Sequence, residues 1–512
     1  MLANVKILSK FNNYTIAFQL IGRLIGLNCL ISFVSLMIQL PGLIGDHGLF
    51  PVSTVYKDIG IIGGNICLCP SLIWLAPNLT TALFLCFTGS ILAFLTVLGY
   101  LKGFVFLLLY ILYLSITKAC GPFTQFQWDI LLLESLFLCV FLYPFLPGLK
   151  NDSTNKFNMQ QPNPFIWVCF LVLIFKLMLS SGLCKITAND PTWTNLTALY
   201  YHFATQPLPN PLAYVFNQLP HIVLKCGVIF VFIVELILPI FIFTNSKLRS
   251  FTAFGFIALQ VIIALTGNYA FFNLLTISLC LPLMNDSVLQ KIIPEKLLTF
   301  LNITIRNNNT KIDNIASEPI FKIRLAQTFK LSVAIILTLL SLVKILSLSG
   351  FIYQIPLIET IDESISPFCI ANSYGLFAVM TKARPEITIE GSYDGINFKE
   401  YTFKFKPGPL NRMLPIIAPY QPRLDWQLWF IALDENNISP ILKNLVYGLM
   451  LNYKPILNLI DYNPFLDKPP NIIKVSIYDY HMTNYKEFFK TGNYWYRDNK
   501  RDYFVVSQKK FK

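Results

Sequence analysis

Apolar runs that are long enough to cross a lipid bilayer recur through the first 350 residues of the chain. A membrane-spanning helix needs about 20 consecutive, mostly apolar residues, and short polar stretches separate the runs seen here. The pattern predicts a polytopic α-helical membrane bundle of about nine spans over residues 1–350. We expect these spans near residues 16–40, 79–99, 103–118, 129–147, 164–184, 222–244, 251–266, 270–284 and 327–349.

From about residue 350 onward, short segments alternate apolar and polar side chains, which is the period of a β-strand. Glu386–Ser392 alternates in this way, an Asp-Gly pair at 394–395 is a strong hairpin signal, and Ile472–Tyr480 predicts a further strand. Ile438–Leu459 predicts one helix, or two broken near Pro455. Residues 351–512 are therefore expected to form a β-sandwich-like domain with helical insertions.

One segment of this domain, Gln421–Phe430 (QPRLDWQLWF), combines a cation, an anion and two tryptophans. Its alternation predicts a strand with Arg423 and Asp425 on the same face, where they would form a partly buried ion pair beside an indole. Two roles stay open: fixing the register of a compact domain, or forming a surface that binds another protein. The candidate residues for either role are Gln421, Arg423, Asp425, Trp426 and Trp429.

Composition and charge support a membrane protein and give it an orientation. Hydrophobic residues make up 54% of the chain and charged residues only 13%, about half of what soluble proteins carry. The net charge of +13 comes mainly from Lys and Arg in loops on the side of the N-terminus, so it indicates topology and not nucleic-acid binding. The N-terminus is then cytosolic and the C-terminal domain lumenal, with Asn195 and Asn437 as glycosylation candidates on the lumenal side.

Ionisable residues at membrane depth are costly and are candidates for function. Within the predicted spans, the main ones are Glu134, Lys176, Lys225 and Glu235. The favoured interpretation is that Glu134 or Glu235 pairs with a lysine of another helix and holds the bundle together. The alternative is a polar chamber that does chemistry or binds a lipid. Lys225 and Glu235 are expected to share one face of a span without touching.

A proline-rich loop follows the fifth predicted span. The segment from residue 190 to 214 contains His202 and then Gln206, Pro207 and Pro209, and its alternating prolines predict a rigid, extended stretch. A single histidine in such an aromatic setting is more often a hydrogen-bonded part of the fold than a catalyst. These four residues are the candidate motif of the loop.

No familiar catalytic or metal-binding spacing is present in the sequence. We therefore expect no metal, no cofactor and no enzymatic activity. Cys67 and Cys69 form a C-x-C pair in a loop, which leaves a thiol-based redox role as a third, weaker hypothesis. Cys369 is alone in the C-terminal region: a bridge to a loop cysteine such as Cys120 stays open, although a buried free thiol is favoured.

Five segments resemble the lipase maturation factors, and they occur in the same order as in that family. They are FQWDILLLE (126–134), FKLMLSSGLCK (175–185), LTALYYHFATQPLPNPLAY (196–214), EGSYDGINFKEYTFKFKPG (390–408) and PYQPRLDWQLWFIAL (419–433). The resemblance implies a multi-pass protein of the endoplasmic reticulum membrane with a lumenal C-terminal domain. It further implies a chaperone-like role in which newly synthesised secretory lipases, such as lipoprotein lipase, are helped to fold, assemble and mature.

The chain departs from the family at a few positions. Tyr420 stands where the family usually has His, Tyr494 precedes Trp495 where the family has paired tryptophans, and Lys176 holds a position often occupied by Arg. The membrane half is also faintly similar to the helical domain of vitamin K-dependent gamma-carboxylase. The alternative function is therefore a membrane enzyme that uses an intramembrane lysine, Lys176 or Lys225.

Overall fold

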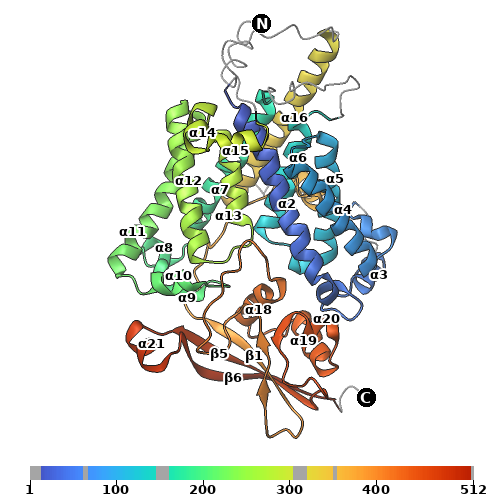
Figure 1. The fold of residues 1–512 in the computed structure, drawn as a ribbon, viewed down its shortest axis with the longest axis vertical. Helices are drawn as coiled ribbons and strands as arrows, with labels where there is room; N and C mark the ends of the chain where they lie inside the picture. Colours follow the sequence, from blue (N-terminus) through green and yellow to red (C-terminus); the bar gives the residue numbers. More distant parts are fainter. Residues whose placement is uncertain (1–12, 62–66, 146–160, 304–319, 350–354, 509–512) are drawn as a thin grey trace.

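The computed structural model describes residues 13–61, 67–145, 161–303, 320–349 and 355–508. Long helices form a bundle, and a β-rich domain lies across one end of it (Figure 1). The main helices of the bundle are α2 (Thr15–Ile44), α4 (Leu79–Val97), α5 (Gly103–Cys120), α6 (Gln127–Leu142), α7 (Pro164–Thr187), α11 (His221–Phe232), α12 (Ser246–Thr266), α13 (Phe272–Leu279) and α16 (Ile320–Leu346). Shorter helices are α3 (Val52–Ile61), α8 (Pro191–Thr194), α9 (Leu199–Thr205), α10 (Pro211–Asn217), α14 (Asp286–Ile292), α15 (Glu295–Phe300) and α17 (Pro356–Ile365).

A multi-pass membrane bundle is confirmed, but the count of about nine spans is not. In the part of the chain that the structure describes, seven helices are long and apolar enough to cross a membrane. Each of the nine predicted runs is helical, yet α6 has 16 residues and α13 only 8. A span also need not be one regular helix: α11 continues into a π-helix, η4 (Ile233–Ile237), and a 3₁₀-helix, η5 (Leu238–Phe243).

Helix α2 packs against α4, α5, α6 and α13. Its contact with α4 is close because small residues face each other across it. A Cβ atom on Gly26 would collide with Thr96, and one on Gly89 would collide with the ring of Phe33. Such small residues let helix backbones approach each other, as is common between membrane helices.

The C-terminal domain has two antiparallel sheets. The larger has the strand order β2-β1-β5-β6, and the smaller pairs β3 with β4. The strands are β1 (Pro385–Ser392), β2 (Lys399–Glu400), β3 (Thr402–Phe403), β4 (Ile460–Tyr462), β5 (Ile472–Met482) and β6 (Trp495–Ser507). The helices are α18 (Arg423–Leu433), α19 (Pro440–Met450), α20 (Lys454–Leu457) and α21 (Tyr485–Thr491).

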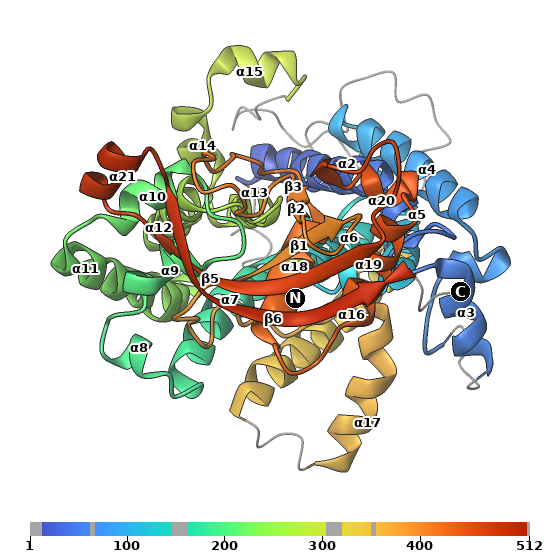
Figure 2. The same cartoon turned by 90° about the horizontal axis from the view of Figure 1, so that it is seen from below.

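The β-rich domain with helical insertions is confirmed. Helices α18 and α19 pack on β1 and β5, and in Figure 1 they lie between the sheet and the bundle. The view from below shows the long strands β5 and β6 crossing under the bundle (Figure 2). Apolar side chains from both parts belong to one continuous core. The domain therefore packs directly against the bundle.

The strand predicted for Gln421–Phe430 is wrong, because residues 423–433 form α18. The buried apolar residues Leu424, Leu428 and Ile431 follow the spacing i, i+4 and i+7 of a helix face. Over ten residues that spacing also resembles alternation, which explains the error. Pro422 precedes the first turn in an extended conformation and sets the start of the helix.

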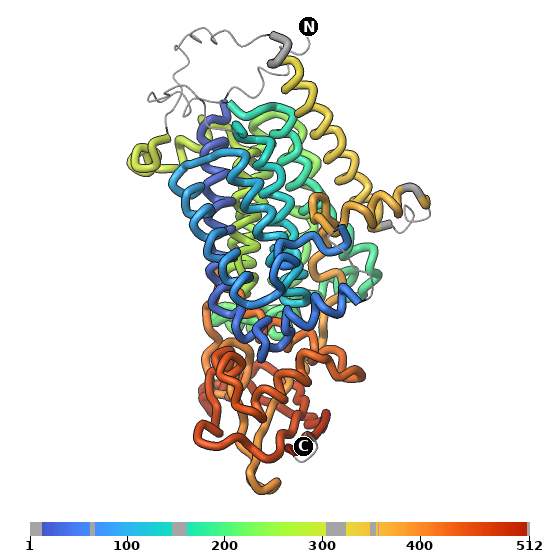
Figure 3. Tube along the Cα trace, turned by 90° about the vertical axis from the view of Figure 1, so that its right-hand side faces the viewer, coloured from blue at the N-terminus to red at the C-terminus, as the bar shows by residue number. Residues whose placement is uncertain are grey.

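The first turn of α2 and the C-terminal domain lie at opposite ends of the bundle (Figures 1 and 3). Asn195 ends α8, and Asn437 precedes α19 in the C-terminal domain; both side chains are exposed. The short helices α8, α9 and α10 lie at the end of the bundle that carries the domain (Figure 1). Both glycosylation candidates are therefore found toward the same end of the molecule.

Candidate functional site

Arg423 joins the C-terminal domain to the membrane bundle. Its Nη1 donates to Asp129 Oδ2 at 2.7 Å and to the Phe123 carbonyl at 2.7 Å, while Nη2 donates to Asp129 Oδ1 at 2.9 Å. Both side chains of the pair are 0% exposed. Tyr113 donates a further hydrogen bond to the same carboxylate. This bidentate, fully buried pair links α18 to α6 across 294 positions of sequence.

The predicted ion pair between Arg423 and Asp425 is therefore wrong. On a helix, residues two positions apart point in different directions. Asp425 instead accepts hydrogen bonds from the backbone N–H groups of Phe405 and Lys406, at 2.9 and 3.0 Å. Each residue of the expected pair fixes a different neighbour of α18: Arg423 holds the bundle, and Asp425 holds the segment after β3.

Side chains of α2 complete the start of α18. Gln39 Nε2 donates to the Gln421 carbonyl at 2.8 Å, and Gln39 Oε1 accepts from the Arg423 N–H at 2.9 Å. The Gln421 N–H donates to Ser35 Oγ at 3.2 Å. Helix N-termini carry backbone N–H groups that need partners, and here a membrane helix supplies one for the Arg423 N–H and another for the Gln421 N–H just before the helix. The amide side chain of Gln421 is itself buried and has no hydrogen-bond partner among the described residues.

The two tryptophans of α18 pack at the same junction. Trp426 is buried with its ring edge-on to Trp128, at a centroid distance of 5.0 Å, and to Tyr269 at 6.0 Å. Trp429 donates from Nε1 to the Thr205 carbonyl at 2.9 Å. The five candidate residues of the segment are thus mostly buried at the contact between bundle and domain.

The proline-rich loop is held by the C-terminal domain on one side. The Arg384 guanidinium donates to the carbonyls of Ala204, Gln206 and Pro207. Arg384 is also paired with Glu386 at 2.8 Å, and Glu386 with Lys406 at 2.9 Å. The end of α9 and the start of the proline-rich stretch therefore present three carbonyl acceptors to one buried cation.

On its other side the loop contacts α12 and the segment that follows it. Gln206 Nε2 donates to the Thr266 carbonyl at 2.8 Å, and the Tyr269 hydroxyl donates to Gln206 Oε1 at 2.7 Å. Pro209 forms a β-bridge with Gly267. His202 Nε2 lies 3.4 Å from the Tyr269 hydroxyl. Burial, followed by the positive charge of Lys185, lowers the pKa of His202 to about 4, so its ring is neutral at physiological pH.

Both intramembrane glutamates pair with a lysine of another helix. Glu134 Oε1 lies 2.6 Å from Lys176 Nζ, and Glu235 Oε2 lies 2.7 Å from Lys185 Nζ. Glu134 Oε2 also accepts from the Tyr374 hydroxyl at 2.8 Å and from Asn372 at 3.1 Å. The first pair therefore also holds the chain that leads into the C-terminal domain.

Lys225 does not share an environment with Glu235. Lys225 is exposed on the first turns of α11, whereas Glu235 is buried in η4. Ten residues make about 2.8 turns of an α-helix, so the two side chains already point about 80° apart, and the π-helix that begins at Ile233 changes the angle further. The expectation that the two residues share a face is wrong.

Several residues of the junction were missed from the sequence. Asp129 is the first residue of the predicted span 129–147, so it is not among the candidate intramembrane residues. Arg384 and Glu386 border a predicted strand, where charged residues are usually solvated. An acid at the first turn of a span, in FQWDILLLE, is the one local signal that could have indicated Asp129.

No disulfide is found in the part of the chain that the structure describes. Cys120 and Cys369 are buried free thiols, and the Cys369 thiol donates to the Ser366 carbonyl at 3.6 Å. Cys69 is partly buried, with its sulfur 3.8 Å from the Tyr56 hydroxyl. Among the described residues, no group of three or more His, Cys, Asp or Glu side chains is placed to hold a metal ion.

A cleft of about 340 Å³ lies beside the contact between α18 and the membrane bundle. Its aromatic lining comes from Phe126, Trp128, Tyr269, Phe377, Trp426 and Phe430. At its border Val379 is 67% exposed and Phe430 is 42% exposed. The cleft can therefore contact apolar side chains of another molecule, while the buried ion pairs keep its walls in place.

Removing one partner of the Arg423–Asp129 pair should destabilise the whole molecule. Arg423→Ala leaves a buried, unpaired carboxylate, which costs about 3–5 kcal/mol. We expect a strongly reduced steady-state level and a lower melting temperature in detergent. The double variant Arg423→Met/Asp129→Leu should recover much of the loss, because apolar replacement of both partners removes the buried charge.

Lys474→Ala is the matched control, because Lys474 pairs with a mostly exposed Asp502 and such pairs contribute about 0–1 kcal/mol. If Arg423→Ala melted at the wild-type temperature, the pair would not be what holds the two parts together.

The depressed pKa of His202 predicts a specific dependence of stability on pH. In the unfolded chain this histidine takes up a proton below its ordinary pKa of 6.5, whereas in the folded protein it stays neutral down to about 4. Stability should therefore fall as the pH falls through this window, by up to about 1.4 kcal/mol per pH unit. His202→Gln should flatten this part of the curve in denaturant unfolding; equal slopes for the variant and the wild type would contradict the assignment.

Comparisons with known proteins agree with this architecture. The family model described as Lipase maturation factor transmembrane domain matches residues 16–291, and the one described as Lipase maturation factor C-terminal domain matches residues 370–505. No solved structure gives a significant match.

Full-length relatives are similar along almost the whole chain. Lipase maturation factor 2 of Homo sapiens is 31% identical, covering 92% of this chain and 80% of that protein. Lipase maturation factor 2 of Xenopus tropicalis is 30% identical, with 91% and 79% covered, and lipase maturation factor 1 of Mus musculus is 28% identical, with 93% and 84% covered. This multi-pass membrane protein with a docked β-rich C-terminal domain belongs to the lipase maturation factor family.

Proposed function

We propose that this protein assists the folding, assembly and maturation of secreted lipases at the endoplasmic reticulum membrane, without enzymatic activity of its own. Similarity to proteins named lipase maturation factor, over 92% of the chain in the human relative, is the observation that carries this proposal. Lipoprotein lipase-like proteins are the clients that we propose. The N-terminus is cytosolic and the C-terminal domain is lumenal, where newly made secretory chains are found.

The aromatic cleft at the junction is the proposed client contact. Its border offers Val379 and Phe430 to an incompletely packed client, and the apolar lining continues inward from them. Arg423 and Asp425 have a different role in this proposal. Both are buried and bonded within the protein, so they position the cleft and do not touch the client.

The membrane-enzyme alternative finds little support in the geometry of its lysines. Lys176 is fully buried in a 2.6 Å pair with Glu134, whose second oxygen is also occupied. Lys225 is exposed near the start of α11. Neither lysine combines a free amine with a dry pocket, which is what a low-pKa nucleophile or base requires. The redox alternative through Cys67 and Cys69 has no geometric support beyond their proximity in sequence.

The client surface is tested by placing a charge at the cleft. Val379→Asp and Phe430→Asp should lower the secretion of active lipoprotein lipase several-fold in cells that lack the endogenous factor, because a buried carboxylate opposes apolar contact. Their expression should stay near wild type. Ile396→Asp, at a still more exposed apolar position in the hairpin loop (82% exposed), should secrete lipase normally; full rescue by both cleft variants would rule out this surface.

Orientation is tested by glycan mapping. We expect an endoglycosidase-sensitive glycan on Asn195 and one on Asn437, with each lost in the corresponding Asn→Gln variant on gels. Asn302→Gln should leave the pattern unchanged, because this sequon would face the cytosol. Digestion of the C-terminal domain by protease added to intact microsomes would contradict the orientation and the function together.

A further inference from the structure

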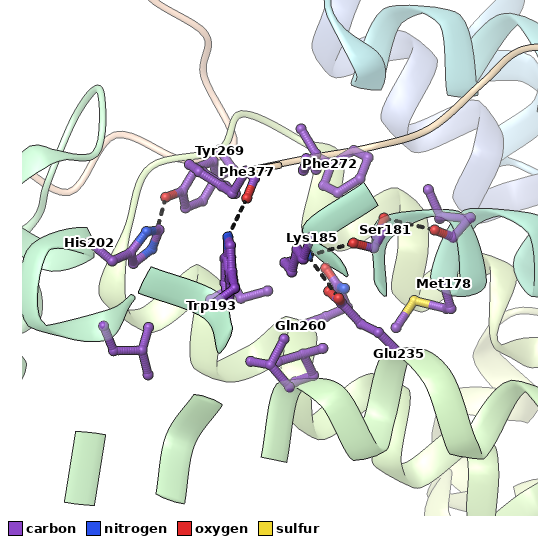
Figure 4. Close-up of a pocket in the computed structure, with 16 residues that line it drawn as sticks. Met178, Ser181, Lys185, Trp193, His202, Glu235, Gln260, Tyr269, Phe272 and Phe377 are labelled. Carbon is purple, nitrogen blue, oxygen red and sulfur yellow. Dashed lines mark hydrogen bonds and ion pairs between the residues drawn. The ribbon is translucent and has the colours of Figure 1, made fainter. Parts of the chain in front are cut away.

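A second hollow lies inside the end of the bundle that faces the C-terminal domain, and it shares a wall with the client cleft, formed by Tyr269, Phe272, Leu376 and Phe377. It is a cavity of about 100 Å³ among α7, α9, η4, α12 and α13. Figure 4 shows His202 and Tyr269 toward one end, Lys185 and Glu235 toward the other, and Trp193 between them. The remaining lining is mostly apolar, including Leu177, Met178, Val231, Leu259, Ile263 and Phe272.

The Lys185–Glu235 pair has unused hydrogen-bonding capacity. Lys185 Nζ donates to Glu235 Oε2 at 2.7 Å and to the Ser181 carbonyl at 2.9 Å, and an ammonium group has a third proton. Glu235 Oε1 accepts no hydrogen bond from any described residue, since Lys185 binds only the other oxygen. The pair therefore offers one acceptor and one donor side by side.

The net charge of the pair determines which kind of polar group can bind beside it. Lys185 and Glu235 sum to zero, and both are buried. A charged head group would leave a net charge in a medium of low dielectric constant, which is costly. A hydroxyl group can donate to the carboxylate and accept from the ammonium without adding charge, so it matches what the pair offers.

The local backbone holds this pair in an unusual way. Glu235 lies in the π-helix η4, and π-turns inside membrane or globular helices are frequent at functional sites. A Cβ atom on Gly182 would meet Leu236 at 2.6 Å and Glu235 at 3.0 Å. Glycine at position 182 thus allows η4 to approach α7 closely, which brings Glu235 next to Lys185.

The cavity is separated from the bilayer by a single layer of helices. Val231 of α11 and Ile263 of α12 line it from inside, while their neighbours Ile229 and Ile262 are 44% and 40% exposed on the outer surface of the same helices. α12 packs against η4 and η5, whereas α11 packs against α9 and η4. α11 and α12 therefore lie between the cavity and the exposed outer surface of the bundle.

We propose that this cavity binds the hydroxyl head group of an uncharged amphipathic lipid from the surrounding membrane, a sterol or a monoacylglycerol. Size supports this class: a cavity of about 150 Å³ holds a molecule such as benzene, so a cavity of about 100 Å³ takes a small head group and the first carbons only. The rest of the lipid lies between α11 and α12.

Photoaffinity labelling of the full-length protein in nanodiscs tests the proposal. The probes are a clickable photoreactive sterol, a clickable photoreactive monoacylglycerol and a clickable photoreactive fatty acid. At least one hydroxyl probe should label peptides from α7, α11 or α12 about tenfold more strongly than the fatty acid. Which of the two labels more strongly identifies the lipid.

Two variants make the test specific. Val231→Phe fills the cavity from α11 and keeps both charged residues of the ion pair, and it should reduce labelling by about tenfold. Ile229→Phe places the same ring on the outer surface of the same helix and should label like the wild type. Glu235→Gln leaves the charge of Lys185 uncompensated, so labelling should shift toward the fatty-acid probe.

Equal labelling of Val231→Phe and Ile229→Phe would overturn the proposal. So would labelling of the wild type by the fatty acid as strong as by both hydroxyl probes, or the absence of labelling by either hydroxyl probe. Thermal melting of each variant separates loss of the cavity from loss of the fold.

Discussion

The structure depends on one buried ion pair, Arg423 with Asp129, that crosses from the C-terminal domain into the membrane bundle. Burial by itself disfavours the charged guanidinium, but the nearby Asp129 carboxylate outweighs it and raises the pKa of Arg423 above its ordinary value. Two charges removed from water are tolerated only when geometry and extra hydrogen bonds compensate for the lost hydration. Here Tyr113 and the Phe123 carbonyl provide those bonds, so the two parts fit together in one relative position.

Other polar contacts at the junction follow the same rule. Glu134 binds Lys176 within the bundle and Tyr374 and Asn372 in the chain leading to the domain. Arg384 ties the proline-rich loop to β1 through three backbone carbonyls. Most of these contacts join segments that are far apart in the sequence, so together they fix where the domain sits on the bundle and place the walls of the aromatic cleft side by side.

Some of this could be predicted from sequence and some could not, for physical reasons. Apolar run length identified the helices of the bundle, and alternation identified β1 and β5, because both signals are local. Pairing of Glu134 and Glu235 with lysines was also foreseen, since an unpaired charge at membrane depth is too costly. The partner of Arg423 lies 294 positions away, and no local pattern carries that information. The segment 421–430 was misinterpreted because helical and alternating spacings coincide over so few residues.

The hydrogen bonds that Ser35 and Gln39 of α2 accept from Gln421 and Arg423, at the start of α18, have a consequence for biosynthesis. Ribosomes make α2 several hundred residues before α18, so the Gln421 and Arg423 N–H groups that bind α2 do not exist while most of the bundle is being synthesised. Until then Gln39 Nε2 can donate to the Ser35 carbonyl within α2, but Gln39 Oε1 lacks the Arg423 N–H from which it accepts in the folded protein. Completion of the last domain is thus also the final assembly step of the first helix, and a chain that stops early leaves both unfinished.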